Sequence, residues 1–197
     1  MVVLARMAAA LIVVAASLVR SVEAQQCSPP PDVMTYCTAG TTVHGCVPSI
    51  AGVGVPSVID TSGFDIVVSD VPGQRAGTIF FGFYPASIPW AQFSPSYQCV
   101  AFPIQRTGDR FSGGVAGQCN GELRLDFNAW RAANSNALGS PYVAGQVFNA
   151  QGWFRDPGAP KQTNLSNALR FVLAPPWPTT PPGMVAIQSG TFEMGCG

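Results

Sequence analysis

Side chains able to perform nucleophilic or acid–base chemistry are few and widely separated. His44 is the single histidine among 197 residues. A Ser-His-Asp or Cys-His site would have to use it, because histidine is the side chain that ordinarily titrates near neutral pH. No Asp or Glu stands between residues 38 and 58 to orient its ring, and Ser49 is the serine nearest to it in sequence. We therefore interpret His44 as a surface residue.

Paired carboxylates, the groups that glycosidases use, are equally hard to assemble. Outside the N-terminal leader, the glutamates are Glu122 and Glu193. Asp65 and Asp126 occupy outward positions of expected strands, and Asp156 begins an Asp-Pro-Gly turn. These structural roles account for the carboxylates without chemistry. We predict no catalytic site, no metal site and no cofactor, so that the chain itself is not an enzyme.

The cysteines are better explained as structural. No Cys-x2-Cys pair accompanies the single histidine, so a zinc site is not expected. Disulfides are typical of exported chains. Short spacing favours the bonds Cys37–Cys46 and Cys99–Cys119, although a sequence does not determine connectivity. The two remaining cysteines would pair with each other, stay free or bridge to another chain; they are Cys27 and Cys196.

One strand offers the best prospect of a binding surface. Trp153 shares a strand face with Asn149, Gln151 and Arg155 in the expected pairing. An indole beside amides and a guanidinium suits stacking on a sugar ring. The alternative, which we favour, is a structural role in which Trp153 packs under a loop or covers a sheet edge. Other aromatic candidates for a binding surface are Trp90, Trp130 and Tyr84.

Short apolar runs between turn residues carry these side chains. The 21 glycines and 18 prolines separate them, as in sandwiches or barrels of short strands. Alternation in residues 123–130 predicts Leu123, Leu125, Phe127 and Ala129 in the core, and Arg124, Asp126 and Asn128 outside. We predict an all-β fold, a β-sandwich of seven or eight short antiparallel strands after a helical signal peptide. The expected strands are residues 49–58, 64–68, 78–83, 96–104, 123–130, 146–155 and 169–173.

The two ends of the chain have different compositions. Residues 1–24 have the layout of a signal peptide, with basic Arg6, an apolar run and a final Ala24. The apolar run is shorter than the roughly 20 residues that span a bilayer, so cleavage and export to the periplasm, cell surface or medium are expected. No later segment is apolar enough to span. Residues 175–183 predict an extended proline-rich linker between a disulfide-bonded domain, residues 25–174, and a tail, residues 184–197.

Residues 36–174 resemble a domain that recurs in large exported proteins of some environmental bacteria. The resemblance is carried by Tyr36-Cys37-Thr38-Ala39, Gly45-Cys46, Asp126-Phe127-Asn128-Ala129, Asn149 to Pro157 and Leu165-Ser166-Asn167-Ala168-Leu169. It implies an extracellular β domain, and the family has no established activity.

Residues 183–195 resemble the opening strand of the formylglycine-generating, sulfatase-modifying factor family. The matching features are the spacing and Met194-Gly195, whereas Ile187-Gln188-Ser189 departs from the usual Pro-Gly-Gly or Pro-Ala-Gly. That family oxidises a cysteine with a cysteine pair and copper, all far downstream of this motif. Cys196 is not one of those cysteines, and the resemblance implies a truncated start of such a domain.

The net charge of the chain limits the classes of partner that we expect. Ten Lys and Arg balance ten Asp and Glu, which disfavours nucleic acid or an anionic membrane as a partner. The leading hypothesis is a non-catalytic exported module for cell-surface binding, adhesion or structural spacing, with a glycan or a protein as partner. The alternatives are the N-terminal fragment of a formylglycine-generating enzyme and a carbohydrate-binding module.

Overall fold

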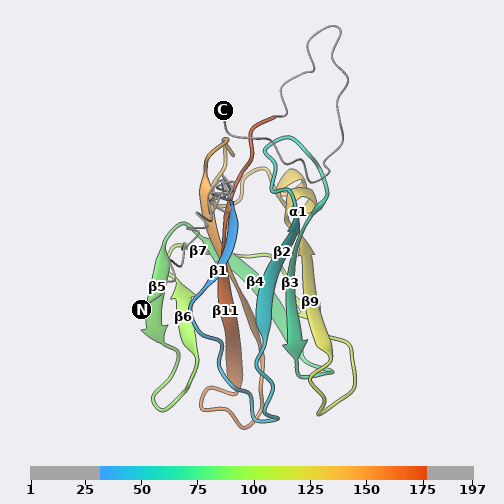
Figure 1. Cartoon of the computed structure of the whole chain (residues 1–197), viewed down its shortest axis with the longest axis vertical. Coiled ribbons are helices and arrows are strands. Elements are labelled where there is room, and N and C mark those ends of the chain that lie inside the picture. The colour runs from blue at the N-terminus through green and yellow to red at the C-terminus, as the bar shows by residue number, and fades with distance from the viewer. Residues whose placement is uncertain (1–31, 177–197) are drawn as a thin grey trace, which may run out of the picture. The chain divides into compact units, whose positions relative to one another are not determined.

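Residues 32–176 are described by a computed structural model (Figure 1). They contain eleven strands and one short helix, and every ladder between strands is antiparallel. The prediction of an all-β antiparallel fold is therefore confirmed. The elements are β1 (Val33–Tyr36), β2 (Ser49–Gly54), β3 (Phe64–Val71), β4 (Ala76–Gly82), β5 (Pro85–Pro89), β6 (Tyr97–Val100), β7 (Ile104–Arg106), β8 (Arg110–Phe111), β9 (Gly121–Asp126), α1 (Phe127–Ala133), β10 (Val147–Arg155) and β11 (Thr163–Val172).

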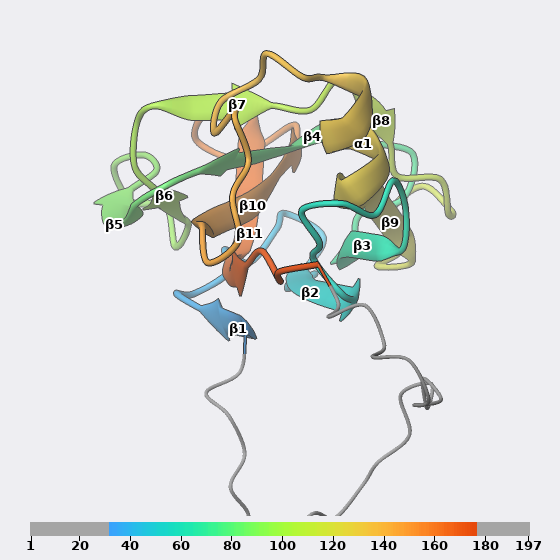
Figure 2. The ribbon, with the colours of Figure 1, turned by 90° about the horizontal axis from the view of Figure 1, so that it is seen from above.

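The strands form three sheets. The large sheet has the order β1-β11-β10-β4-β7, with β8 also paired to β4. A small sheet, β2-β3-β9, packs on one face of the large sheet, and the two-stranded β5–β6 hairpin covers part of the other face. Figure 2 shows the large sheet between these two partners. The face toward β2-β3-β9 is called the inner face below, and the opposite face is the outer face.

Phenylalanines fill the space between the two larger sheets. Phe81, Phe148 and Phe171 project from the large sheet, and Phe127 comes from the start of α1. Their rings meet mostly edge to face or tilted, with centroids 4.9 Å apart for Phe127 and Phe171 and 5.3 Å apart for Phe81 and Phe127. All four side chains are fully buried. Burial of these large rings stabilises the packing of the two sheets.

The central strand β4 is apolar on both faces, as its sequence predicts. Ile79 and Phe81 enter the inner core, and Phe80 belongs to a second, smaller core on the outer face. This two-sided burial requires the β5–β6 hairpin as a cover. Strands β1, β5, β7 and β8 are absent from the sequence-based prediction, because two to five residues are too few to establish an alternating pattern.

The alternation from 123 to 130 ends earlier than predicted. Strand β9 stops at Asp126, and helix α1 begins at Phe127 with Asp126 as its N-cap. The Asp126 carboxylate accepts the backbone N–H of Ala129 at 3.0 Å. Phe127 is buried as expected, but Asn128 is fully buried instead of exposed, because the helical turn rotates it toward the loop before β3.

The described residues stop short of several predicted segments. The signal peptide, residues 1–24, the tail, residues 184–197, and most of the linker lie outside them, as do Cys27 and Cys196. Near the end of the described range, Ala174 donates its N–H to the Pro56 carbonyl at 2.7 Å. Within residues 32–176, no helix is long and apolar enough to cross a membrane.

Candidate functional site

Two disulfides connect distant parts of the domain. They join Cys37 to Cys99, 62 residues apart, and Cys46 to Cys119, 73 residues apart. The four predicted structural cysteines are therefore bonded, but the predicted pairing was wrong. Proximity in sequence misled the prediction, because each cysteine bonds to a partner that is distant along the chain. Cys37, directly after β1, bonds to Cys99 in β6, and Cys46 bonds to Cys119 in the loop before β9.

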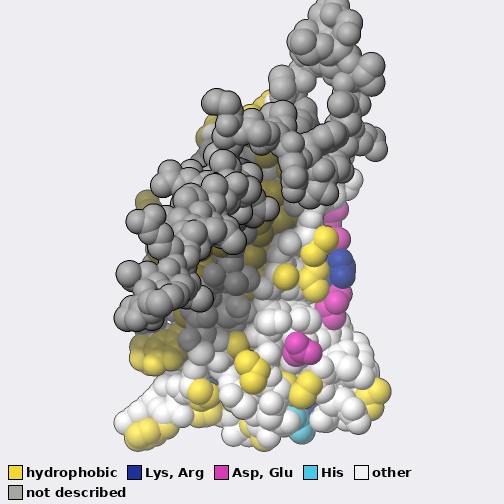
Figure 3. All heavy atoms as spheres, in the orientation of Figure 1, with side chains coloured by type: hydrophobic (Ala, Val, Ile, Leu, Met, Phe, Trp, Pro, Cys, Tyr) yellow, Lys and Arg dark blue, Asp and Glu magenta, His cyan; other side chains and the backbone are white. Residues whose placement is uncertain are grey.

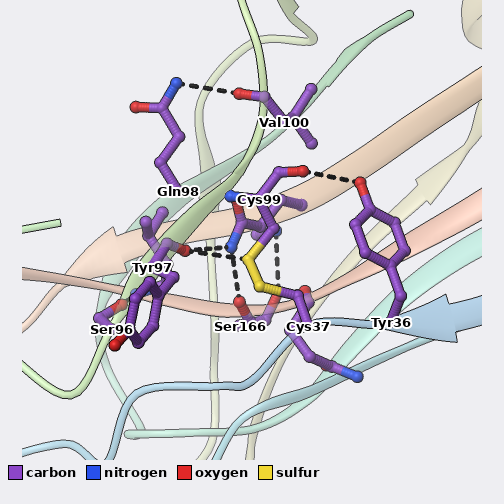
Figure 4. The surroundings of a disulfide bond; sticks show 12 residues. Tyr36, Cys37, Ser96, Tyr97, Gln98, Cys99, Val100 and Ser166 are labelled. Carbon is purple, nitrogen blue, oxygen red and sulfur yellow. Dashed lines mark hydrogen bonds between the residues drawn. A yellow bond between two sulfur atoms is a disulfide. The ribbon is translucent and has the colours of Figure 1, made fainter. Parts of the chain in front are cut away.

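The Cys37–Cys99 bond fastens the β5–β6 hairpin to the large sheet (Figure 4). Beside it, the Tyr36 hydroxyl donates a hydrogen bond to the Cys99 carbonyl at 2.7 Å. Burial raises the pKa of Tyr36 to about 12, so this hydroxyl stays protonated far above neutral pH.

Gln151 holds the same hairpin from the sheet side. Its side-chain oxygen accepts the Cys99 N–H at 2.9 Å, and its side-chain nitrogen donates to the carbonyls of Tyr97 and Ser166. Asn149, on the same face, donates to the Phe83 carbonyl at 2.9 Å. Both amides are buried, so they do not form part of a binding surface, contrary to the prediction. The face was assigned correctly, but the hairpin that covers it was not foreseen.

Trp153 and Arg155, farther along the same face of β10, remain accessible, since Trp153 is half-buried and Arg155 is exposed. Trp153 is half-buried against the second core, whose buried members are Phe80, Val100 and Leu165. Trp153 therefore contributes part of its ring to packing, as the interpretation that it packs under a loop or covers a sheet edge would require, but that interpretation stays a prediction. The ring nevertheless borders an open groove.

This aromatic groove lies between the outer face of the large sheet and the covering hairpin. It encloses about 100 Å³ of open space. Phe80 and Trp153 contribute from the sheet, Trp90 follows β5, and Phe102 lies between β6 and β7. The side chain of Phe102 is 71% exposed, so it offers a ring to solvent. The remaining groove residues are Thr78, Gln98, Ile104 and Arg106.

Cations lie over both tryptophans of the groove. The guanidinium carbons of Arg106 and Arg155 are 5.9 Å and 5.6 Å from the Trp153 ring centroid. The Lys161 ammonium is 4.2 Å from the centroid of Trp90. These distances fall within the range of cation–π attraction. The Trp90 N–H donates to the Thr163 hydroxyl at 3.0 Å, which fixes the indole in place.

No carboxylate neutralises these three cations in the described part of the chain. The two ion pairs among the described residues are both formed by Arg124, with Asp65 and Glu122 on the small sheet. Asp156 follows Arg155 in sequence, but its buried carboxylate accepts the Val43 N–H and an Asn164 N–H instead. Asp156 also begins the predicted turn, in which the Ala159 N–H donates to the Asp156 carbonyl at 3.0 Å.

Exposed hydrophobic side chains also gather on the hairpin. Tyr84, Ile88 and Phe93 are all exposed. Figure 3 shows hydrophobic atoms at the lower left, where Figure 1 places this hairpin, and charged atoms along the right edge beside β3 and β9. The outer side of the domain is therefore aromatic and cationic, while the small sheet carries paired charges.

Two other side chains that the sequence analysis considered for catalysis or binding do not line the groove. His44 lies 3.2 Å from the Arg75 guanidinium, and Trp130 packs on Phe81 and Phe127 in the inner core. Within residues 32–176, no three His, Cys, Asp or Glu side chains form a group that could hold a metal.

Three members of the site were missed from the sequence. Phe102, Arg106 and Lys161 lie in a loop, a three-residue strand and a turn, where no repeating pattern marks them. The only usable signal was the alternation of Ile104-Gln105-Arg106 beside a predicted strand. Tyr84 is exposed as proposed, but it does not line the groove.

No family model, curated protein or solved structure matches this chain. The resemblances of residues 36–174 and 183–195 therefore stay predictions.

Proposed function

We propose that residues 32–176 form a non-catalytic carbohydrate-binding module of an exported protein, with the aromatic groove as the binding site. The observation that carries the proposal is the exposed ring of Phe102 beside the two half-buried tryptophans of the groove. Aromatic rings offer apolar faces that match the C–H face of a sugar, while neighbouring polar groups bind its hydroxyls.

The polar side chains of the groove suit binding better than catalysis. They are Thr78, Gln98 and Arg106. None of these is a general base near neutral pH, and no carboxylate lines the groove. The Gln98 side-chain nitrogen donates to the Val100 carbonyl, which leaves the side-chain oxygen to accept a sugar hydroxyl.

The two disulfides are compatible with an oxidising location outside the cytoplasm. We therefore include in the proposal the export that residues 1–24 predict. A module held together by disulfides would keep the groove rigid in such an environment, and binding to cell-surface or extracellular glycans would give the adhesion role expected from the sequence.

The proposal is tested by screening the disulfide-bonded chain on a glycan array and measuring hits by calorimetry. Phe102→Ala should weaken binding about fivefold, because losing an aromatic contact costs on the order of 1 kcal/mol. Phe102 is exposed, so the substitution should leave the melting temperature unchanged.

Tyr84→Ala is the matched control, since Tyr84 is an exposed aromatic residue outside the groove lining. It should leave the affinity unchanged. Absence of any glycan ligand, or equal losses in the two variants, would contradict the proposal.

A further inference from the structure

We infer that the groove selects acidic saccharides, whose carboxylate or sulfate groups pair with Arg106, Arg155 and Lys161. This inference rests on the proposed function, because it names the ligand class of the same site. It begins from the fact that three exposed cations converge on two indoles from three separate elements.

Each cation comes to a tryptophan of the groove from a different element, and Arg106 also lines the groove itself. Arg106 on β7 is the cross-strand partner of Phe80, which places it beside the groove. Arg155 follows Trp153 by two residues on β10 and so projects from the same face. Lys161 lies in the turn after β10 and reaches back over Trp90.

Packing against an indole orients these groups without neutralising them. The ring attracts the cation through its quadrupole, which leaves the hydrogen-bond donors at the edges of a guanidinium unused. Among residues 32–176, neither Arg106, Arg155 nor Lys161 forms a side-chain hydrogen bond or an ion pair with another residue. Donors held in place and lacking an acceptor are suited to bind carboxylate or sulfate oxygens.

Cations on the small sheet and beside the groove differ in whether they form ion pairs. Arg124, on the small sheet, lies between Asp65 and Glu122, so the cation there is compensated. The nearest carboxylate in sequence to the groove cations, that of Asp156, is buried and forms no ion pair with them. Its Oδ2 accepts the N–H groups of Val43 and Asn164, and its Oδ1 is buried without a hydrogen-bond partner. Arg106, Arg155 and Lys161 thus bring three positive charges that form no ion pair among the described residues to two indoles of one groove, where an anionic ligand would meet them together.

The sheet edges beside the groove favour a saccharide over an extended peptide. A peptide that adds a strand needs a run of free backbone donors and acceptors. Strand β5 begins and ends with proline, which has no N–H, and β7 is three residues long. Side chains, and not a sheet edge, must therefore make the contacts, as they do with sugars.

The inference is tested by calorimetry on the disulfide-bonded full chain. The probes are an oligogalacturonate, its methyl ester, a sulfated galactan oligosaccharide and the same galactan without sulfate. At low salt, at least one acidic probe should bind about tenfold more tightly than its neutral counterpart. The difference should shrink as salt increases, because screening weakens exposed charge pairs. Whichever acidic probe binds identifies the anionic group as carboxylate or sulfate.

Three variants locate the charge contacts. Arg106→Gln, Arg155→Gln and Lys161→Gln should each weaken the acidic probe severalfold and change the neutral probe less than twofold. The matched control is Arg170→Gln, on β11 of the same sheet but outside the groove. It should have no effect on either probe. Unchanged melting temperatures would show that the variants fold.

The outcomes separate the two proposals. Equal binding of acidic and neutral probes would overturn the acidic-ligand inference and leave the carbohydrate-binding proposal standing. Failure of all four probes and of the glycan array would overturn both. Binding of a poly-glutamate peptide as tightly as the best acidic saccharide would overturn the choice of a saccharide.

Discussion

The side-chain oxygen of Gln151 accepts the backbone N–H of Cys99 at 2.9 Å, so a buried amide of the large sheet holds the hairpin that covers it. The same amide donates to the carbonyls of Tyr97 at 2.8 Å and Ser166 at 2.7 Å. One side chain thus satisfies three backbone groups from two different strands. Because all three groups are part-buried or buried, each would be costly to leave without a partner.

Gln151→Glu should lower the free energy of unfolding at pH 7 by about 3 kcal/mol or more, since a carboxylate would face two carbonyl oxygens in a buried site. The folded protein should raise the pKa of the new carboxyl above its unfolded value. The variant should therefore regain stability relative to the wild type as the pH falls from 7 toward 4, where the group is protonated and can donate again.

Urea unfolding of both proteins at several pH values measures this difference. Gln118→Glu is the control, because Gln118 is exposed and its side chain forms no hydrogen bond with another described residue. It should be neutral at every pH. A Gln151→Glu variant as stable as the wild type at pH 7 would show that the amide does not hold the hairpin.

The disulfide connectivity makes a second prediction. Non-reducing peptide mapping should recover Cys37 linked to Cys99 and Cys46 linked to Cys119. Bonds across 62 and 73 residues should each stabilise the domain by about 4 kcal/mol in the chain-entropy estimate. Replacing Cys37 and Cys99 with Ala should also increase hydrogen exchange in β6 more than replacing Cys46 and Cys119. Recovery of a Cys37–Cys46 peptide would contradict the structure.

Tyr36 makes the stability of the hairpin depend on pH in the alkaline range. Its pKa is raised to about 12 by burial, against an ordinary value of 10.0. Between these two values the unfolded chain loses the proton while the folded chain keeps it, so stability should fall as pH rises through that window. Tyr36→Phe should remove this part of the slope and cost about 1 kcal/mol at pH 8, through the hydrogen bond lost to Cys99.

Denaturant unfolding at pH 8, 10 and 11.5 gives the comparison. Burial also raises the pKa of Tyr142, so the wild-type slope has more than one source. The difference between wild type and Tyr36→Phe isolates the contribution of Tyr36. Parallel curves for the two proteins across this range would refute the assignment.

Long patterns in the sequence were sufficient to predict several strands of the two larger sheets. Alternation or continuous apolar runs identified most of β3, β4, β9 and β10, because each strand has a face in the core that every second residue must fill. The hairpin cover was not predictable in this way. Pro85 and Pro89 read as loop residues, yet they bound a short strand whose outer edge is free.

The residues of the candidate site were likewise predictable only where they lie in long strands. Trp153 and Arg155 were identified because they lie in a long strand, and their face was assigned correctly. Asn149 and Gln151 were misjudged, because alternation gives the face of a residue but not whether another segment covers that face. Tertiary packing alone brings Phe102 and Arg106 into the groove lining and Lys161 over the Trp90 ring, and the local sequence holds no periodic signal for it.

Asn128 shows where alternation itself fails, and it yields the last prediction. Its side-chain oxygen accepts the Ser57 N–H at 3.0 Å, and its nitrogen donates to the carbonyls of Val55 and Ser62. Asn128→Leu keeps the approximate volume but leaves three backbone groups without partners. It should lower the free energy of unfolding by about 3 kcal/mol and speed hydrogen exchange at Ser57. Asn136→Leu, at an exposed position after α1, should change neither quantity. If Asn128 were instead an outward strand residue, as the alternation predicted, the two variants would be indistinguishable in both measurements.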